Sequence, residues 1–469
     1  MKKYIFLSFI FTILIAFLFQ AEIKILIRNS VSPDLYQRVS FIKKLVLNQD
    51  FGFHRYENVL GETYNEIKDF IYSEEFSFNI KGKETRSNSK VIIFNIPPIF
   101  PAVRVNHYNT AYIDFFNDNL IYATKNGIFY KVTRKSKELT FTPFNSNILE
   151  FFKDKKIEKN ASINYYNSST ISKFGIKDIL VNDKDIYVSY IEDFGNDNYN
   201  TSILKAKISD SLVFSKHFSS TDYINSNFKE FYPIQSGGRI VDYKKDSLLF
   251  SLGEYRYRLK AQDLSSDNGK IIAINKFDGG SRIISYGHRN PQGLDYNKKN
   301  KYIISTEHGP NGGDEINFSL SSDKLKNYGW PISSYGYHYS SENAINDSHE
   351  GSKNRVVKGA PLYKSHFEHG FVEPIFYWEK SPGVSEVNFI RHKKNYPEFI
   401  VSTLGYGTMQ NPDSHHLLHY KYDISTKTID QIARYSINER VRDIKYNTKT
   451  NELFFVGEST GVIGILNLN

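Results

Sequence analysis

Apolar and polar residues follow one recurring arrangement through most of the chain. An apolar strand is followed by a polar turn rich in Asn, Asp and Lys, and then by a second apolar strand, six times in all. Two short apolar runs joined by such a turn predict a β-hairpin. The six predicted hairpins span residues 112–123, 179–188, 239–250, 293–304, 387–400 and 441–455.

This recurrence predicts an all-β fold built of stacked units, because a single hairpin cannot bury its apolar face alone. Six hairpins, with room between them for further strands, indicate a six-bladed β-propeller over residues 91–469. A pair of β-sandwiches is the alternative, although it would not need the same turn chemistry each time. In a propeller, the long stretch 333–374 would form loops on the upper face, where function usually lies.

The first residues have the pattern of an export signal. Lys2 and Lys3 precede an apolar run over residues 4–19, and no small-x-small cleavage site follows clearly. Residues 1–21 are therefore expected to be a signal peptide or a retained signal anchor in the inner membrane, which places the remainder in the periplasm or another extracytoplasmic space. Residues 22–90 mix charged stretches with helical spacing and are interpreted as a membrane-proximal extension.

Composition agrees with a sheet protein and limits the chemistry. Aromatic residues make up 15% of the chain, carried by 34 Tyr and 36 Phe, and such residues favour pleated sheet surfaces. Cysteine is absent, so any metal must be held by oxygen or imidazole ligands. The net charge of +9 is scattered rather than gathered in a stripe, which indicates a solvated surface and no nucleic-acid partner.

Candidate chemistry is concentrated where glycines stand beside His, Arg, Asp and Glu. Such composition marks loops in which the backbone closely approaches a ligand while charged side chains converge. The three stretches are residues 286–294, 306–317 and 327–331.

Two kinds of donor stand out in these loops. Backbone carbonyls of Gly309 and Pro310, together with the carboxylates of Asp314 and Glu315, are hard oxygen donors of the kind that calcium prefers. Arg289 offers a planar fork for a carboxylate ligand. The alternative is a tight turn between blades in which the acidic residues pair with local arginines.

These three stretches, with Arg440 and Arg442 in residues 440–443, resemble the glucose/sorbosone dehydrogenase family. The resemblance implies a six-bladed propeller that uses PQQ with calcium, oxidises a sugar or related alcohol and passes electrons to an external acceptor. Residues implied to contact the cofactor are Arg289, Asn290, His308, Asp314, Arg440 and Arg442. The implied calcium ligands are the backbone carbonyls of Gly309 and Pro310.

The chain departs from the family pattern at three places. Gln235 or Ile234 stands where the family has the His that takes the hydroxyl proton, and neither side chain can act as that base. The early glycine-rich segment has no clear counterpart over residues 97–112, and residues 401–407 lack the expected lysine. His308 is then the candidate catalytic base, while Glu254 either lines the site or caps a turn.

Two other functions compete with an oxidoreductase. A propeller that has lost proton abstraction could bind a glycan or a protein partner, which the missing His and Lys favour. A hydrolase of the propeller-lactonase kind would need several metal-binding side chains converging from different blades, and the sequence offers no evident set. Fold by itself does not decide among these.

Overall fold

The computed structural model describes residues 78–85, 88–96, 110–125, 127–152, 175–227, 231–321, 324–337, 360–391, 393–405 and 411–469. All of them belong to one compact unit, Leu60–Asn469. The predicted signal segment and most of the predicted extension lie outside these described residues. Within them, no helix is long and apolar enough to cross a membrane.

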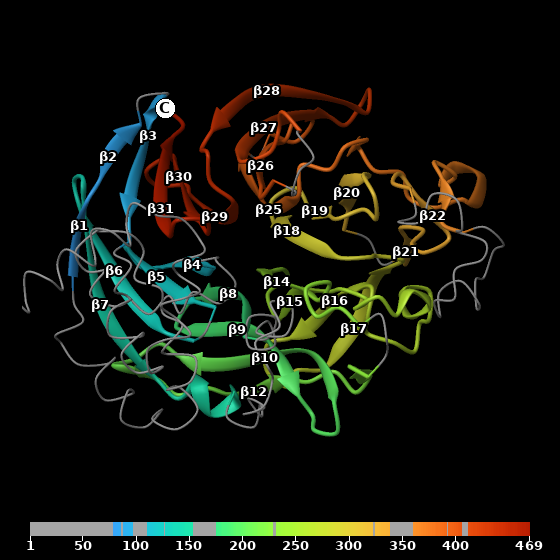
Figure 1. Ribbon diagram of the computed structural model, residues 1–469, viewed down its shortest axis with the longest axis horizontal. Coiled ribbons are helices and arrows are strands. Elements are labelled where there is room, and N and C mark those ends of the chain that lie inside the picture. Colours follow the sequence, from blue (N-terminus) through green and yellow to red (C-terminus); the bar gives the residue numbers. More distant parts are fainter. Residues whose placement is uncertain are drawn as a thin grey trace, which may run out of the picture. The chain divides into compact units, whose positions relative to one another are not determined.

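Six sheets stand around a common axis as the blades of a propeller (Figure 1). In each blade the first strand lies nearest the axis and the following strands pair outward in antiparallel order. Blade 1 contains β4 (Ala111–Phe116), β5 (Asn119–Thr124), β6 (Phe129–Lys135) and β7 (Glu138–Ser146). Blade 2 contains β8 (Ile176–Asn182), β9 (Asp185–Asp193), β10 (Asn198–Lys207) and β12 (Ser215–Phe218). Blade 3 contains β14 (Gly237–Asp242), β15 (Ser247–Leu252), β16 (Lys270–Asn275) and β17 (Ser281–Tyr286).

The second half of the ring repeats this plan. Blade 4 contains β18 (Pro291–Asn297), β19 (Tyr302–Glu307), β20 (Asp314–Leu320) and β24 (Phe376–Trp378). Blade 5 contains β25 (Val384–Arg391), β26 (Glu398–Thr403), β27 (His416–Asp423) and β28 (Thr428–Ser436). Blade 6 contains β29 (Val441–Asn447), β30 (Glu452–Gly457), β31 (Val462–Asn467) and β3 (Asn88–Asn95).

Short elements decorate these blades. The additional strands are β1 (Phe78–Lys81), β2 (Lys83–Thr85), β11 (Ser211–Leu212), β13 (Ile224–Asn225), β21 (Lys326–Asn327), β22 (Ser333–Ser334) and β23 (Leu362–Tyr363). The described helices are single 3-10 turns, η2 (Ile148–Phe152), η3 (Arg258–Ala261) and η4 (Phe367–His369).

The six-bladed propeller predicted from the sequence is confirmed. Each predicted hairpin forms the first two strands of one blade, nearest the axis. The polar turns allow this because Asn117, Asp183 and Asn451 adopt positive φ values of 56°, 54° and 54°. Asn and Asp tolerate this left-handed region better than other residues with a side chain, so the recurring turn chemistry marks each hairpin.

The ring closes by combining strands from both parts of the sequence. In blade 6, β3 pairs antiparallel with β31, from Val91 opposite Leu466 to Asn95 opposite Val462. The expected domain boundary at residue 91 therefore falls inside a strand of the propeller. β1 pairs with β7 and β2 pairs with β3, so residues 78–90, expected in the extension, also take part in propeller sheets.

Apolar side chains fill the spaces between neighbouring blades. Six buried clusters occupy the six interfaces, and the cluster between blades 6 and 1 includes Phe94 and Phe454. Near the axis, a side-chain oxygen on the first strand of one blade accepts a hydrogen bond from a backbone N–H on the first strand of a neighbouring blade. These acceptors and donors are Asp443 and Ile113, Asp114 and Val181, Asp178 and Ile240, Glu386 and Leu294, Asp295 and Phe389, and Asn388 and Tyr446, at 2.7–3.0 Å.

We expect removal of β3 to open the ring. A chain that starts at residue 97 loses Val91 and Phe94, which are fully buried, and exposes the edge of β31. Burial of two such side chains is worth about 3–6 kcal/mol. The free energy of unfolding, measured by urea denaturation, should fall by at least about 3 kcal/mol. A chain that starts at residue 77 keeps β1–β3 and should match the full chain; equal stability of the two truncated chains would contradict closure by β3.

Candidate functional site

The candidate residues lie on one face of the propeller. Arg289 lies two residues before the first strand β18, and Arg440 directly precedes the first strand β29. His308 and Glu458 directly follow the second strands β19 and β30. In an antiparallel hairpin, the start of the first strand and the end of the second lie at the same edge. The fold therefore gathers segments from blades 3, 4, 5 and 6 around the axis at this face.

A buried polar network fixes the loop that carries Arg289. Glu307 accepts hydrogen bonds from the Arg289 backbone N–H at 2.9 Å and from Asn317 at 3.1 Å. Its other contact is His288 Nδ1 at 3.1 Å, and His288 Nε2 lies 2.8 Å from Ser285 Oγ. All are buried, so this Ser–His–Glu arrangement holds the loop and is not open to a substrate.

The loop that contains Gly309 and Pro310 is held by the carboxylate of Asp314. Asp314 accepts hydrogen bonds from the backbone N–H of Gly309 at 3.1 Å and of Gly383 and Val384 at 3.0 Å each. Both Asp314 oxygens are thus engaged with backbone, and the structure supports a role in holding the loop rather than in facing the cofactor.

One ring nitrogen of His308 is also engaged in a hydrogen bond to the backbone. Its Nε2 lies 2.6 Å from the Val384 carbonyl oxygen, which can only accept, so Nε2 carries the proton. Burial lowers the pKa of His308, with Asp314 opposing and Arg289 adding to the shift. The imidazole is therefore neutral, and only Nδ1 is left to accept a proton.

Arg440 and Arg442 share one buried carboxylate. Glu458 Oε1 lies 3.0 Å from Arg440 Nε, and its Oε2 lies 2.8 Å from Arg442 Nε and 2.9 Å from Thr110 Oγ1. Burial opposes ionisation, but the two guanidinium groups lower the pKa of Glu458 to about 2. Glu458 therefore stays ionised, and the group of Arg440, Arg442 and Glu458 has a net positive charge.

Lys125, which directly follows β5 in blade 1, adds a further cation to this group. Its backbone N–H donates to the Thr110 carbonyl at 2.9 Å, and Thr110 in turn bonds Glu458. Burial and repulsion from Arg442 lower the pKa of Lys125 to about 8, while Glu458 opposes the shift. Three cations therefore surround one carboxylate.

Side-chain amides connect the two arginine regions. Asn290 Oδ1 accepts from the Gly237 backbone N–H at 3.2 Å and from Gln292 Nε2 at 3.0 Å. Gln292 Oε1 accepts from Arg442 Nη1 at 3.2 Å. The Asn290 amide thus fixes blade 3 against blade 4, and Gln292 extends the network to blade 6.

Gln235, at the position where the family has its catalytic His, bonds two charged residues. With its amide oriented to satisfy both partners, its nitrogen donates to Glu254 Oε1 and its oxygen accepts from Arg289 Nη2, each at 2.9 Å. The side chains of Gln235 and Glu254 are buried. Burial raises the pKa of Glu254 to about 7, against the attraction of Arg289, Arg258 and Arg256.

His415 lies beside residues 401–407, where the family resemblance leads us to expect a lysine. Gly405 follows β26 with φ of 72°, and a Cβ built on it would lie 2.3 Å from His415 Nε2. The Gly405 carbonyl accepts from Arg440 Nη1 at 2.9 Å. Burial lowers the pKa of His415, and Arg440 adds to this shift, so the lysine is replaced by a neutral ring beside Arg440.

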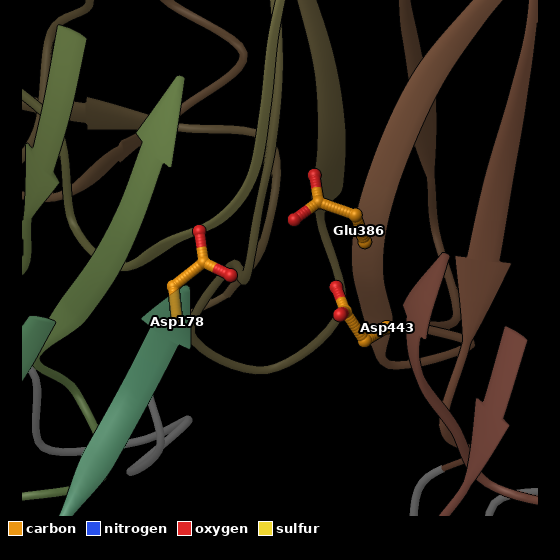
Figure 2. Close-up of side chains that lie close together, drawn as sticks. All are labelled: Asp178, Glu386 and Asp443. Atoms are coloured by element: carbon orange, nitrogen blue, oxygen red, sulfur yellow. The ribbon is translucent and has the colours of Figure 1, made fainter. Parts of the chain in front are cut away.

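Three carboxylates converge from different blades at the axis, which the sequence did not reveal. Figure 2 shows Asp178, Glu386 and Asp443 pointing toward one another from β8, β25 and β29. Arg239 lies among them, with Nη1 3.2 Å from Asp178 and 2.8 Å from Asp443, and Nε 2.8 Å from Glu386. The guanidinium occupies the place that a cation would take, so this cluster carries no metal site.

Several site residues were not found from the sequence. Glu458 and Lys125 follow ordinary second strands and belong to no recognisable motif. The available signal was positional, because a charged residue directly after the second strand of a blade lies at the same face as the motif loops. Lys125 follows Thr124, and Glu458 follows Gly457, at equivalent places in blades 1 and 6.

Comparison with known families identifies proteins that are similar to this chain. The family described as glucose/sorbosone dehydrogenase matches residues 148–463. Aldose sugar dehydrogenase YliI of Escherichia coli is 34% identical over 231 residues, which cover 46% of this chain and 55% of that protein. Quinoprotein glucose dehydrogenase B of Acinetobacter calcoaceticus is 34% identical over 127 residues, covering 23% and 26%. The chain thus spans about half the length, or less, of these curated relatives.

Solved structures show the same architecture. The crystal structure of the soluble aldose sugar dehydrogenase from Escherichia coli superposes with a TM-score of 0.53 at 21% identity, covering 77% of this chain and 96% of that one. A crystal structure of glucose dehydrogenase gives 0.54 at 19% identity, covering 78% and 97%. At these identities, the likeness shows the fold alone.

We expect Arg239→Leu to destabilise the propeller strongly, because three buried carboxylates would lose their guanidinium. Breaking a buried ion pair typically costs about 3–5 kcal/mol, which urea denaturation would detect. The matched control is Lys449→Ala, since Lys449 and Asp118 form an exposed pair, and its effect should be within about 0.5 kcal/mol. A small effect of Arg239→Leu would mean that the cluster does not hold the blades together.

The same cluster predicts how stability depends on pH. Burial raises the pKa of Asp178 to about 7 and of Glu386 to about 8, despite Arg239. The native state therefore binds protons more tightly than the unfolded chain, whose carboxyls titrate near about 4. The two carboxyls therefore add to the free energy of unfolding. Their contribution is complete below about pH 4 and is lost as pH rises through about 7–8. Glu386→Gln should flatten the decline between these pH values; an unchanged slope would refute the shifted pKa.

Proposed function

The chain belongs to the glucose/sorbosone dehydrogenase family, and on this basis we propose an extracytoplasmic oxidoreductase that uses PQQ and calcium. Its substrate would be a sugar or a related alcohol, oxidised at a CH–OH group. The observation that carries the proposal is the set of cations on one face: Arg440, Arg442 and Lys125 beside Glu458, and Arg289 on the His308 carbonyl. Names of the relatives, a sugar dehydrogenase and a quinoprotein, support the same reaction class.

The donor set fits an anionic cofactor such as PQQ, which carries three carboxylates. Arg440 and Arg442 both pair with the buried carboxylate of Glu458, so these three side chains together carry a net positive charge. Arg289 and Arg442 both lower the pKa of His308. Planar guanidinium groups bind carboxylates through paired hydrogen bonds, so these residues would hold and orient the cofactor.

The loop after β19 fits a calcium ion. Its backbone carbonyls at Gly309 and Pro310 would be the ligands, and Asp314 fixes the loop through the Gly309 N–H. Oxygen donors of this type suit calcium. When bound, the quinone would take the hydride from the alcohol carbon, with the metal polarising its carbonyl. Since the position of the family base holds no histidine, His308 Nδ1 is one candidate to accept the hydroxyl proton.

A propeller that binds a glycan or a protein without turnover is the second candidate. Gln235 at the position of the family base, and Gly405 near the position of the family lysine, favour it. This protein would keep the arginine set but would not remove the hydroxyl proton. An external electron acceptor and a possible membrane tether through residues 4–19 belong to the first proposal only.

The test is titration of the chain lacking residues 1–21 with PQQ in calcium, followed by cofactor absorbance. Bleaching of the bound cofactor by members of a panel of aldoses would establish a dehydrogenase. Binding without bleaching by any aldose or simple alcohol would leave a cofactor site without turnover. Absence of binding would refute the proposal in favour of a partner-binding propeller.

We expect Arg442→Gln to weaken PQQ binding by about 10- to 100-fold, because a charge-assisted hydrogen bond contributes about 1.5–3 kcal/mol. Isothermal titration calorimetry would measure the affinity. Arg434→Gln is the matched control, since Arg434 lies on the outer strand β28 and is nearly half exposed. Equal affinity of both variants would show that the cofactor does not use the Arg440–Arg442 pair.

A further inference from the structure

Glu254 has a carboxylate oxygen without a hydrogen-bond partner in the described part of the chain. Its Oε1 accepts from Gln235, whereas Oε2 has no such partner, although the residue is 0% exposed. An unpaired buried carboxylate oxygen is costly unless it is protonated or serves a function.

Backbone contacts bind Glu254 closely to the candidate site. Its N–H donates to the Arg289 carbonyl at 3.1 Å, and the next N–H, of Tyr255, donates to the Gln235 carbonyl at 3.0 Å. Gly253 permits this approach, since a Cβ there would lie 2.3 Å from the Gln235 carbonyl oxygen. Gln235, Glu254 and Arg289 are thus joined through both main chain and side chains.

We propose that Glu254 is the proton acceptor of this enzyme, in place of a histidine; the inference rests on the proposed function. The substrate O–H bond breaks and its proton moves to Oε2 of Glu254. The carbon that bears this oxygen loses its hydrogen as a hydride, which a bound quinone would accept. The alcohol becomes a carbonyl compound, and the quinone is reduced by two electrons. The proton leaves Glu254 to solvent before the next turnover.

Gln235 controls access to this carboxylate. It is 4% exposed and bridges Glu254 Oε1 and Arg289 Nη2. When the amide turns aside, Arg289 remains beside Glu254 and the carboxylate becomes reachable. Gln235 itself only positions the acceptor, because an amide does not take up a proton at neutral pH.

Glu254 suits the task better than the other candidates on this face. Burial raises its pKa to about 7, even though Arg289, Arg258 and Arg256 all oppose the shift. A base is most effective when its pKa lies near the working pH. His308 has its Nε2 committed to the Val384 carbonyl, and Glu458 is tied to two arginines that hold its pKa at about 2.

The first experiment compares Glu254→Gln, Glu254→Asp and the wild type in the PQQ- and calcium-loaded protein. The rate kcat of the wild type should rise with pH and level off above about 7. Glu254→Gln should bind PQQ with unchanged affinity but lose at least about 100-fold in kcat, with no break in the pH profile. Glu254→Asp should recover part of the rate. Gln235→Ala should keep a break but move it to higher pH, because the Glu254 carboxylate loses a hydrogen-bond donor.

A second measurement does not depend on turnover. Infrared difference spectra of the protein without cofactor should show the carbonyl stretch of a protonated carboxylic acid at pH 6 and its loss at pH 9. Glu254→Gln should lose the part of this signal that comes from Glu254, while the parts from Asp178 and Glu386 remain; His308→Asn should keep the whole signal.

The outcomes separate the two proposals. Absence of PQQ binding or turnover in the wild type would refute the proposed function and, with it, the catalytic role of Glu254. Wild-type turnover together with a normal kcat and pH break in Glu254→Gln would refute the inference alone. If the break vanished instead in His308→Asn, His308 would be the acceptor. An unchanged carboxylic-acid signal in Glu254→Gln would also overturn the inference.

Discussion

The guanidinium of Arg239 at the axis is the interaction on which the ring most depends. It pairs with carboxylates from blades 2, 5 and 6 while its own strand belongs to blade 3. A buried charge is expensive unless it is paired and hydrogen-bonded. Because Asp178, Asp443 and Glu386 also accept backbone N–H groups of neighbouring inner strands, the same carboxylates satisfy the arginine and link the blades.

That central arrangement also supports the upper face. Arg239 donates to the backbone carbonyls of Gln292 and Arg442 at 2.6 and 2.7 Å. Gln292 and Arg442 contact each other through their side chains, and Arg442 reaches Glu458. The cations on the face are therefore positioned by the structural core, so the ring and the site would be disturbed together.

The departures from the family pattern are compensated locally rather than left as gaps. His415 fills the space beside Gly405, Lys125 brings a cation from blade 1, and Gln235 is bonded by Glu254 and Arg289. The face keeps a positive charge suited to an anionic ligand, and under the proposal made for Glu254 a carboxylate would accept the proton instead of an imidazole. Replacing the proton-accepting group would alter the pH range of the reaction, whereas the face would still bind an anionic ligand.

The sequence by itself determined the blade number, because each hairpin carries its own turn residues and each turn is a local property of a few amino acids. It also located the loops around Arg289 and Gly309, whose glycines and charges are contiguous. Only the tertiary structure decided that Asp178, Glu386 and Asp443 surround Arg239, and that Lys125, Glu254, His415 and Glu458 border the site. These contacts join residues up to about 330 positions apart, and no local pattern encodes which blades become neighbours across the axis or how burial shifts a carboxyl pKa.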